Sequence, residues 1–167
     1  VRVLGKCGGY DSDIVAGMYW AAGIDQPGLL GSSTPARVLN LSLGGTGSCD
    51  PAYRDAVAEI TGQPFNVVIV ASAGNSSGLP VGRPANCPGV IAVTAHAING
   101  ESPQYTNIGP LNKQGPNPTI SAPGGGRPAG LGALDAAVDN PRWAGFSIWS
   151  TGRDLVNAPG IVRANNP

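Results

Sequence analysis

Residues 67–78 read Val67-Val-Ile-Val-Ala-Ser-Ala-Gly-Asn75-Ser-Ser-Gly78, an apolar run that ends in small residues and one carboxamide. Such a run predicts a strand buried on both faces of a parallel sheet. Because parallel sheets carry ligand chemistry at the carboxyl ends of their strands, we expect Asn75 at such an edge. An amide there can donate a hydrogen bond to the oxyanion of an acyl-transfer reaction. An ordinary Gly-Asn turn is the alternative interpretation.

The flanking sequence alternates between strand-like and helix-like patterns. Strands are predicted at residues 1–4, 37–43, 66–73, 89–95 and 119–122. A helix is predicted at 13–22, capped by Asp11 or Ser12 and ending at Gly23. A second helix is predicted to begin at Asp50-Pro51 and to end at Gly62. This order predicts an α/β fold with a mainly parallel sheet.

Composition limits the function classes. The 167 residues contain 10 Lys and Arg and 10 Asp and Glu, so the formal net charge is zero, and only 12% of residues are charged. This balance argues against nucleic acid or an anionic membrane as the main partner. No apolar run approaches the length of a membrane span. Residues 126–167 are poorly readable, with a short helix favoured at 131–138 and a turn-rich remainder.

Five motifs occur in a characteristic order. They are Val1-Arg-Val-Leu-Gly5 with the helix ending at Trp20-Ala-Ala-Gly23, Val38-Leu-Asn-Leu-Ser-Leu-Gly-Gly45, Val68-Ile-Val-Ala-Ser-Ala-Gly-Asn75, Pro84-Ala-Asn-Cys-Pro-Gly-Val-Ile-Ala-Val93 and Ser121-Ala-Pro-Gly124. The set, which covers about residues 1–125, resembles the subtilisin-like serine proteases. The likeness is greatest to the secreted bacterial members with a Lys-Cys-Gly-Gly loop. The resemblance implies an incomplete three-layer fold, with helices on both faces of a mainly parallel sheet.

The catalytic motifs of that family do not occur. Its catalytic Asp lies in Asp-Ser/Thr-Gly, whereas Asp13 follows Asp11-Ser12 here. His96 precedes Ala97-Ile98 rather than Gly-Thr-His, and no Gly-Thr-Ser-Met-Ala is present. We therefore expect residues 1–167 to be the central part of a peptidase domain, without the Asp, His and Ser triad and inactive alone. His96 is interpreted as a surface or supporting histidine rather than a general base.

The resemblance also assigns roles to individual residues. It implies that Asn75 is the oxyanion-hole amide and that Gly82 lies at the floor of the S1 pocket, which would admit bulky apolar P1 side chains. An extended substrate would lie between two facing edges and against one further S1 wall. The edges are Gly8-Gly9 and Ser42-Leu43-Gly44-Gly45, and the wall is Ala71-Ser72-Ala73-Gly74. Such binding would add a strand through main-chain hydrogen bonds. Ordinary turn glycines are the alternative interpretation.

Catalysis in this family needs no cofactor. A structural calcium ion is implied at backbone carbonyls of Ala85, Cys87 and Val90, since hard cations bind such oxygens. Cys7 and Cys49 each follow a predicted strand, so both loops are expected at one sheet edge. We therefore predict a Cys7–Cys49 disulfide, with Cys87 free or paired outside the chain, and export to an oxidising compartment. Three free thiols are the alternative.

Three functions remain to be compared. The first is part of a secreted serine endopeptidase whose partners are extended peptide or protein substrates and the remainder of the same domain. The second is a non-catalytic peptide-binding or interaction domain on this scaffold. The third, a nucleotide binder, is disfavoured because Gly44-Gly-Thr-Gly47 lacks the Lys-Ser/Thr of a phosphate loop.

Overall fold

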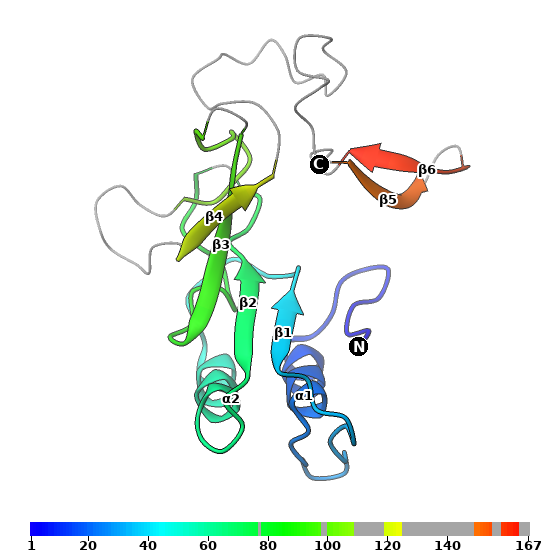
Figure 1. The fold of residues 1–167 in the computed structure, drawn as a ribbon, viewed down its shortest axis with the longest axis vertical. Helices are drawn as coiled ribbons and strands as arrows, with labels where there is room; N and C mark the ends of the chain where they lie inside the picture. Colours follow the sequence, from blue (N-terminus) through cyan, green and yellow to red (C-terminus); the bar gives the residue numbers. More distant parts are fainter. Residues whose placement is uncertain (77, 98–99, 109–118, 125–148, 155–157, 164–167) are drawn as a thin grey trace.

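The computed structural model describes residues 1–76, 78–97, 100–108, 119–124, 149–154 and 158–163. Its main sheet has four parallel strands in the order β1-β2-β3-β4 (Figure 1). The strands are β1 (Val38–Leu41), β2 (Val68–Ser72), β3 (Val90–His96) and β4 (Ile120–Pro123). The parallel α/β fold predicted from the sequence is thus confirmed.

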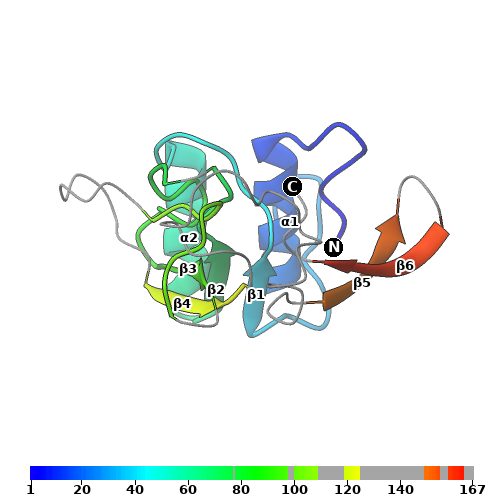
Figure 2. The same ribbon diagram turned by 90° about the horizontal axis from the view of Figure 1, so that it is seen from above.

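Two helices pack against one face of this sheet (Figure 2). Helix α1 (Asp11–Ala22) buries Ile14, Met18 and Ala22, and it ends at Gly23, whose φ of 75° suits a left-handed cap. Its N-cap is Tyr10, so the predicted cap by Asp11 or Ser12 is wrong. Neither described helix is long and apolar enough to cross a membrane.

Helix α2 (Pro51–Thr61) begins as the sequence predicts. The Asp50 carboxylate accepts a hydrogen bond from the Tyr53 N–H at 3.1 Å, and Pro51 occupies the first helical position. Its buried face presents Tyr53, Val57 and Ile60 to the core. These side chains anchor α2 beside α1 and against β2.

The register of the sheet separates a buried face from a partly open one. Leu39 pairs with Ile69, which pairs with Val90, and all three are buried on the helix side. On the opposite side, Val68 remains 43% exposed. The prediction that residues 67–73 are buried on both faces is therefore wrong for the described part of the chain. The physical reason is that α1 and α2 cover the same face.

Two further differences concern the ends of the chain. Residues 1–4 form no strand; the local pairing is an isolated bridge between Gly5 and Gly8. Strands β5 (Trp149–Asp154) and β6 (Ala158–Arg163) form an antiparallel pair in a stretch for which no strand was predicted from the sequence. The helix favoured at 131–138 lies outside the described residues.

Candidate functional site

The carboxyl ends of β1, β2 and β3 lie at one edge of the sheet, and the candidate site is built there (Figure 1). Asn75 follows the end of β2 by three residues and is exposed. Among the described residues, none hydrogen-bonds its carboxamide. The side-chain N–H groups of Asn75 are therefore available to an external acceptor at this edge.

One predicted edge of the groove, Ser42-Leu43-Gly44-Gly45, directly follows β1 and is largely exposed. Gly45 and Arg83 exchange two backbone hydrogen bonds of 2.9 Å each, which fixes this edge against the loop that contains Gly82. Gly82 is buried, and a Cβ added to it would collide with the Gly45 carbonyl. Glycine is required at position 82 by this close approach of two backbones.

The predicted S1 wall, Ala71-Ser72-Ala73-Gly74, lies next to that edge. Ala71 and Ala73 are each 1% exposed and belong to the core, so their methyl groups are not free for contact. Ser72 is exposed, and its hydroxyl donates to the Leu43 carbonyl at 3.5 Å. Only the backbone and Ser72 of this wall can therefore face a ligand.

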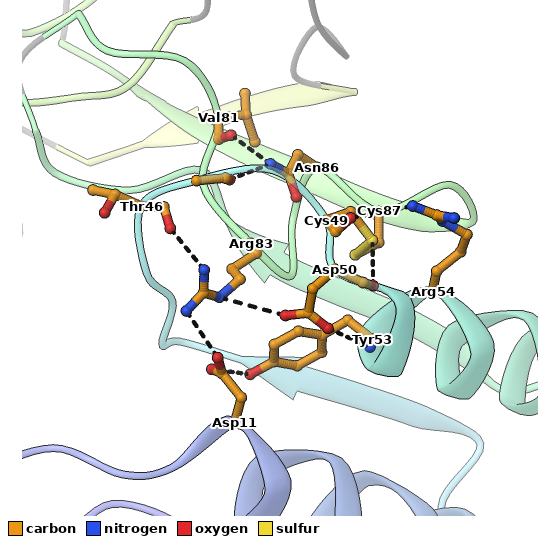
Figure 3. A network of polar contacts seen from close by, with 11 residues as sticks. Asp11, Thr46, Cys49, Asp50, Tyr53, Arg54, Val81, Arg83, Asn86 and Cys87 are labelled. Atoms are coloured by element: carbon orange, nitrogen blue, oxygen red, sulfur yellow. Dashed lines mark hydrogen bonds and ion pairs between the residues drawn. A yellow bond between two sulfur atoms is a disulfide. The ribbon is translucent and has the colours of Figure 1, made fainter.

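The other predicted edge, Gly8-Gly9, is exposed and precedes α1. Two residues further on, the Asp11 carboxylate accepts a hydrogen bond from the Arg83 guanidinium at 2.8 Å (Figure 3). Another guanidinium nitrogen of Arg83 donates to the Thr46 carbonyl at 3.0 Å. Arg83 thus connects the segment after Gly8-Gly9 with the edge that contains Gly44 and Gly45.

Tyr53 extends this network into the core. Its hydroxyl donates to Asp11 at 3.1 Å (Figure 3). Burial is the main reason why the pKa of Tyr53 lies above its ordinary value, and the Asp11 carboxylate raises it further. The phenol is therefore neutral at neutral pH and acts as a donor. Asp50, the α2 cap, approaches the Arg83 guanidinium at 3.8 Å.

The disulfide joins Cys49 to Cys87, and Cys7 is free and exposed. The predicted Cys7–Cys49 pairing is therefore wrong. It assumed that residues 1–4 form a strand of the sheet, but Cys7 lies in the turn between Gly5 and Gly8. Cys49 and Cys87 instead meet because the bridge between Gly45 and Arg83 brings their loops together, with 5.1 Å between the Cα atoms.

The described residues contain no group of three or more His, Cys, Asp or Glu side chains that could hold a metal ion. Ala85, Cys87 and Val90, the predicted calcium residues, surround a turn in which the Cys87 carbonyl accepts the Val90 N–H at 3.1 Å. A carbonyl oxygen has a second lone pair, so this turn is compatible with a cation site built from backbone oxygens alone. Calcium binding there stays a prediction.

His96 is half-buried at the end of β3, and its Nδ1 lies 2.9 Å from the Ala97 carbonyl. Because a carbonyl can only accept, Nδ1 carries a hydrogen in this contact. The contact orients the ring and leaves Nε2 as the unprotonated nitrogen of the neutral imidazole, so the supporting role of His96 stays a prediction.

The sequence interpretation did not identify Thr106 and Asn107, the buried polar side chains within the described ranges, which are 3% and 2% exposed. The Asn107 backbone and side chain hydrogen-bond to the loop that carries Asn75. Their local sequence, Tyr105-Thr-Asn107, has the polarity of an ordinary surface loop and gives no signal of burial.

Comparisons with known proteins identify the family of the chain. The model of the subtilase family matches residues 1–151. An extracellular protease of Xanthomonas campestris is 35% identical over 163 residues, which are 97% of this chain and 26% of that protein. An extracellular basic protease of Dichelobacter nodosus is 41% identical over 111 residues, which are 65% of this chain and 18% of that protein.

A solved protease structure is also similar to this chain. A protease from Pseudoalteromonas arctica superimposes with a TM-score of 0.72 at 34% identity, covering 98% of this chain and 43% of that one. The chain thus spans less than half of the length of each of these relatives. Since the family model matches most of the 167 residues, the chain belongs to the subtilase family.

Proposed function

We propose that the chain is part of a secreted serine endopeptidase that hydrolyses peptide bonds through an acyl-enzyme. In this proposal the chain supplies the oxyanion-hole amide Asn75 and the walls of the substrate groove. The observation that carries it is the exposed carboxamide of Asn75, without a partner among the described residues, at the sheet edge next to a glycine-rich wall.

The chemistry required of Asn75 is electrostatic. Attack on a peptide carbonyl places negative charge on its oxygen, and a preorganised N–H donor stabilises that charge. The contact strengthens mainly in the transition state, so it raises kcat rather than ground-state affinity. The nucleophile and its base would come from the remainder of the same protease domain, because their motifs do not occur in these 167 residues.

The substrate is proposed to be an extended peptide or protein segment. Gly8 and Gly9 on one side, and Gly44 and Gly45 on the other, would offer main-chain groups for β-strand addition. Gly82 would form a floor without a side chain, which suits bulky apolar P1 residues. The ion pair between Arg83 and Asp11 supports this arrangement, since it connects the two segments that carry these edges.

Two observations support secretion. The relatives from Xanthomonas campestris and Dichelobacter nodosus are described as extracellular proteases, and a disulfide is typical of proteins in oxidising compartments. A structural calcium ion at backbone oxygens of Ala85, Cys87 and Val90 is also proposed. If it binds there, a chelator lowers the melting temperature of the complete protein; an unchanged melting temperature contradicts this site.

Covalent labelling tests the proposal. The complete protein is expected to hydrolyse a peptide substrate and to react with a serine-directed phosphonate at one residue. The 167-residue chain alone is expected to do neither. A complete protein that binds extended peptides, but is neither labelled nor hydrolytic, supports the alternative of a non-catalytic binding domain. Inhibitor-sensitive hydrolysis by the isolated chain contradicts the proposed division of roles.

A further inference from the structure

Asn107 lies under the loop that carries Asn75 and contacts it on both sides. Its backbone N–H donates to the Gly74 carbonyl at 3.0 Å, and its side-chain oxygen accepts the Ser76 N–H at 2.7 Å. Its side-chain nitrogen donates to the Pro80 carbonyl at 2.9 Å. These three contacts fix the residues immediately before and after Asn75 and the end of the same loop.

Asn107 is itself held by the sheet. The Thr94 hydroxyl, on β3, donates to the Asn107 carbonyl at 3.0 Å and lies 2.7 Å from the Thr106 hydroxyl. The Thr106 hydroxyl accepts the N–H of Ala95 at 3.1 Å. The Thr106 carbonyl accepts the N–H of Gly78 at 3.0 Å, which adds a further contact to the loop. Hydrogen bonds therefore run from β3 through Thr106 and Asn107 to both sides of Asn75.

The burial of these groups is costly. A polar side chain without a partner loses its contacts with water on burial, so its position is stable only when its hydrogen bonds are satisfied. Within the described residues, the buried polar side chains Thr106 and Asn107 both lie at this loop. The φ of 113° at Gly74 keeps the backbone close to Asn107, and an added Cβ would collide with its amide.

We propose that Asn107 is a positioning residue for the oxyanion donor. It contacts no substrate; it fixes the backbone on either side of Asn75, so that the exposed carboxamide is directed at one point. Rigid placement matters because an oxyanion donor acts only if it is oriented before the reaction. The inference rests on the proposed role of Asn75 in the complete peptidase.

Kinetics of the complete protein test this inference. We expect Asn107→Ala to lower kcat by about 10-fold to 10²-fold with little change in KM, because displacement of a catalytic group by about 1 Å costs that much. Loss of folded enzyme would also lower the apparent kcat at unchanged KM, so kcat is calculated per active site titrated with the serine-directed phosphonate; a residue that only stabilises the fold would leave that value unchanged. Thr94→Val, which has nearly the same shape, is a milder variant in case Asn107→Ala does not fold; we expect a smaller loss of kcat.

A double-mutant cycle separates positioning from independent effects. If Asn107 acts through Asn75, the variant with both Asn75→Ala and Asn107→Ala has nearly the kcat of Asn75→Ala alone. Val57→Ala is the matched control, since Val57 is fully buried on α2 and lies outside the site; it should lower the melting temperature and leave kcat unchanged. Additive losses for Asn75 and Asn107, or an unchanged kcat in Asn107→Ala, overturn the inference.

Hydrogen exchange supplies a readout that does not depend on activity. Asn107→Ala should accelerate exchange of the Ser76 amide, whose hydrogen bond it removes, but not exchange in α2. Unchanged exchange at Ser76 overturns the inference even if the protein is no peptidase. If Asn75→Ala leaves kcat unchanged while exchange at Ser76 does accelerate, the proposed function fails and the structural contact of Asn107 stands.

Discussion

Arg83 illustrates how much one side chain can connect. Its backbone pairs with Gly45, and its guanidinium contacts Thr46 and Asp11, so it links its own loop, the predicted groove edge and the start of α1 (Figure 3). The ion pair itself is partly exposed, with side-chain exposures of 31% for Arg83 and 41% for Asp11. Such a pair adds little stability, about 1 kcal/mol or less. Its contribution is geometric, because it fixes the relative positions of segments far apart in the sequence.

The raised pKa of Tyr53 predicts that the stability of the fold decreases at alkaline pH. The pKa of Tyr53 in the folded protein is raised above the ordinary value of 10.0, so its neutral form stabilises the fold fully below pH 10.0. Above that pH the unfolded chain loses the proton first, and stability falls until the folded phenol also ionises. Tyr53→Phe should therefore lose less unfolding free energy between pH 8 and pH 11 than the native protein does.

Urea unfolding at the two pH values measures this difference. Tyr10→Phe is the control, since Tyr10 is 79% exposed and its hydroxyl belongs to no described network. Tyr53→Phe will still lose some unfolding free energy at alkaline pH, because other tyrosines also have raised pKa values. Burial and a hydrogen bond to Glu59 raise the pKa of Tyr19 to about 12. Equal losses for Tyr53→Phe and the native protein would show that Tyr53 is not coupled to folding.

Among the elements, those with a strong local pattern were predictable from sequence. Helix α2 has a capping Asp50, Pro51 at its first position and apolar residues at helical spacing, and its predicted start is confirmed. Residues 1–4 had only a short apolar run, which carries no information about a pairing partner. The antiparallel pair of β5 and β6 lies in sequence where alternation of apolar residues is weak.

The disulfide also could not be predicted from local sequence. A pairing of cysteines depends on which loops meet, and the bridge between Gly45 and Arg83 could not be derived from spacing. Among the residues of the candidate site, some could likewise be identified from sequence and others could not. Asn75 could be proposed from sequence because it follows a strand in a motif of a recognisable family, whereas Asn107 could not, since its contacts lie about 30 residues away along the chain.

The bond between Cys49 and Cys87 predicts a loss of stability on removal. It closes a loop with a sequence separation of 38, for which chain entropy gives about 4 kcal/mol. Replacing both cysteines by Ala should lower the unfolding free energy by about 2–4 kcal/mol. Cys7→Ala is the control, because Cys7 is free and exposed. A non-reduced digest that links Cys7 to either cysteine would contradict the pairing.

At the scale of the whole molecule, the chain combines a covered and a partly open sheet face. Helices α1 and α2 pack on one side (Figure 2). Val38, Val68 and Ile120 are 57%, 43% and 52% exposed. The chain spans less than half of its relatives' length, and the proposed function places the nucleophile in the remainder of the domain. The oxyanion donor and the nucleophile would then come from different parts of one protein.

The kinetics of Asn75→Ala in the complete protein test the central claim most directly. Because the amide is proposed to contact oxygen mainly in the transition state, kcat should fall by about 10²–10³-fold while KM changes little. Asn66→Gly is a control, since Asn66 lies before β2, away from the edge where Asn75 lies, and glycine tolerates its φ of 50°. A kcat of Asn75→Ala close to that of the native protein would show that Asn75 is only a turn residue and would contradict the account.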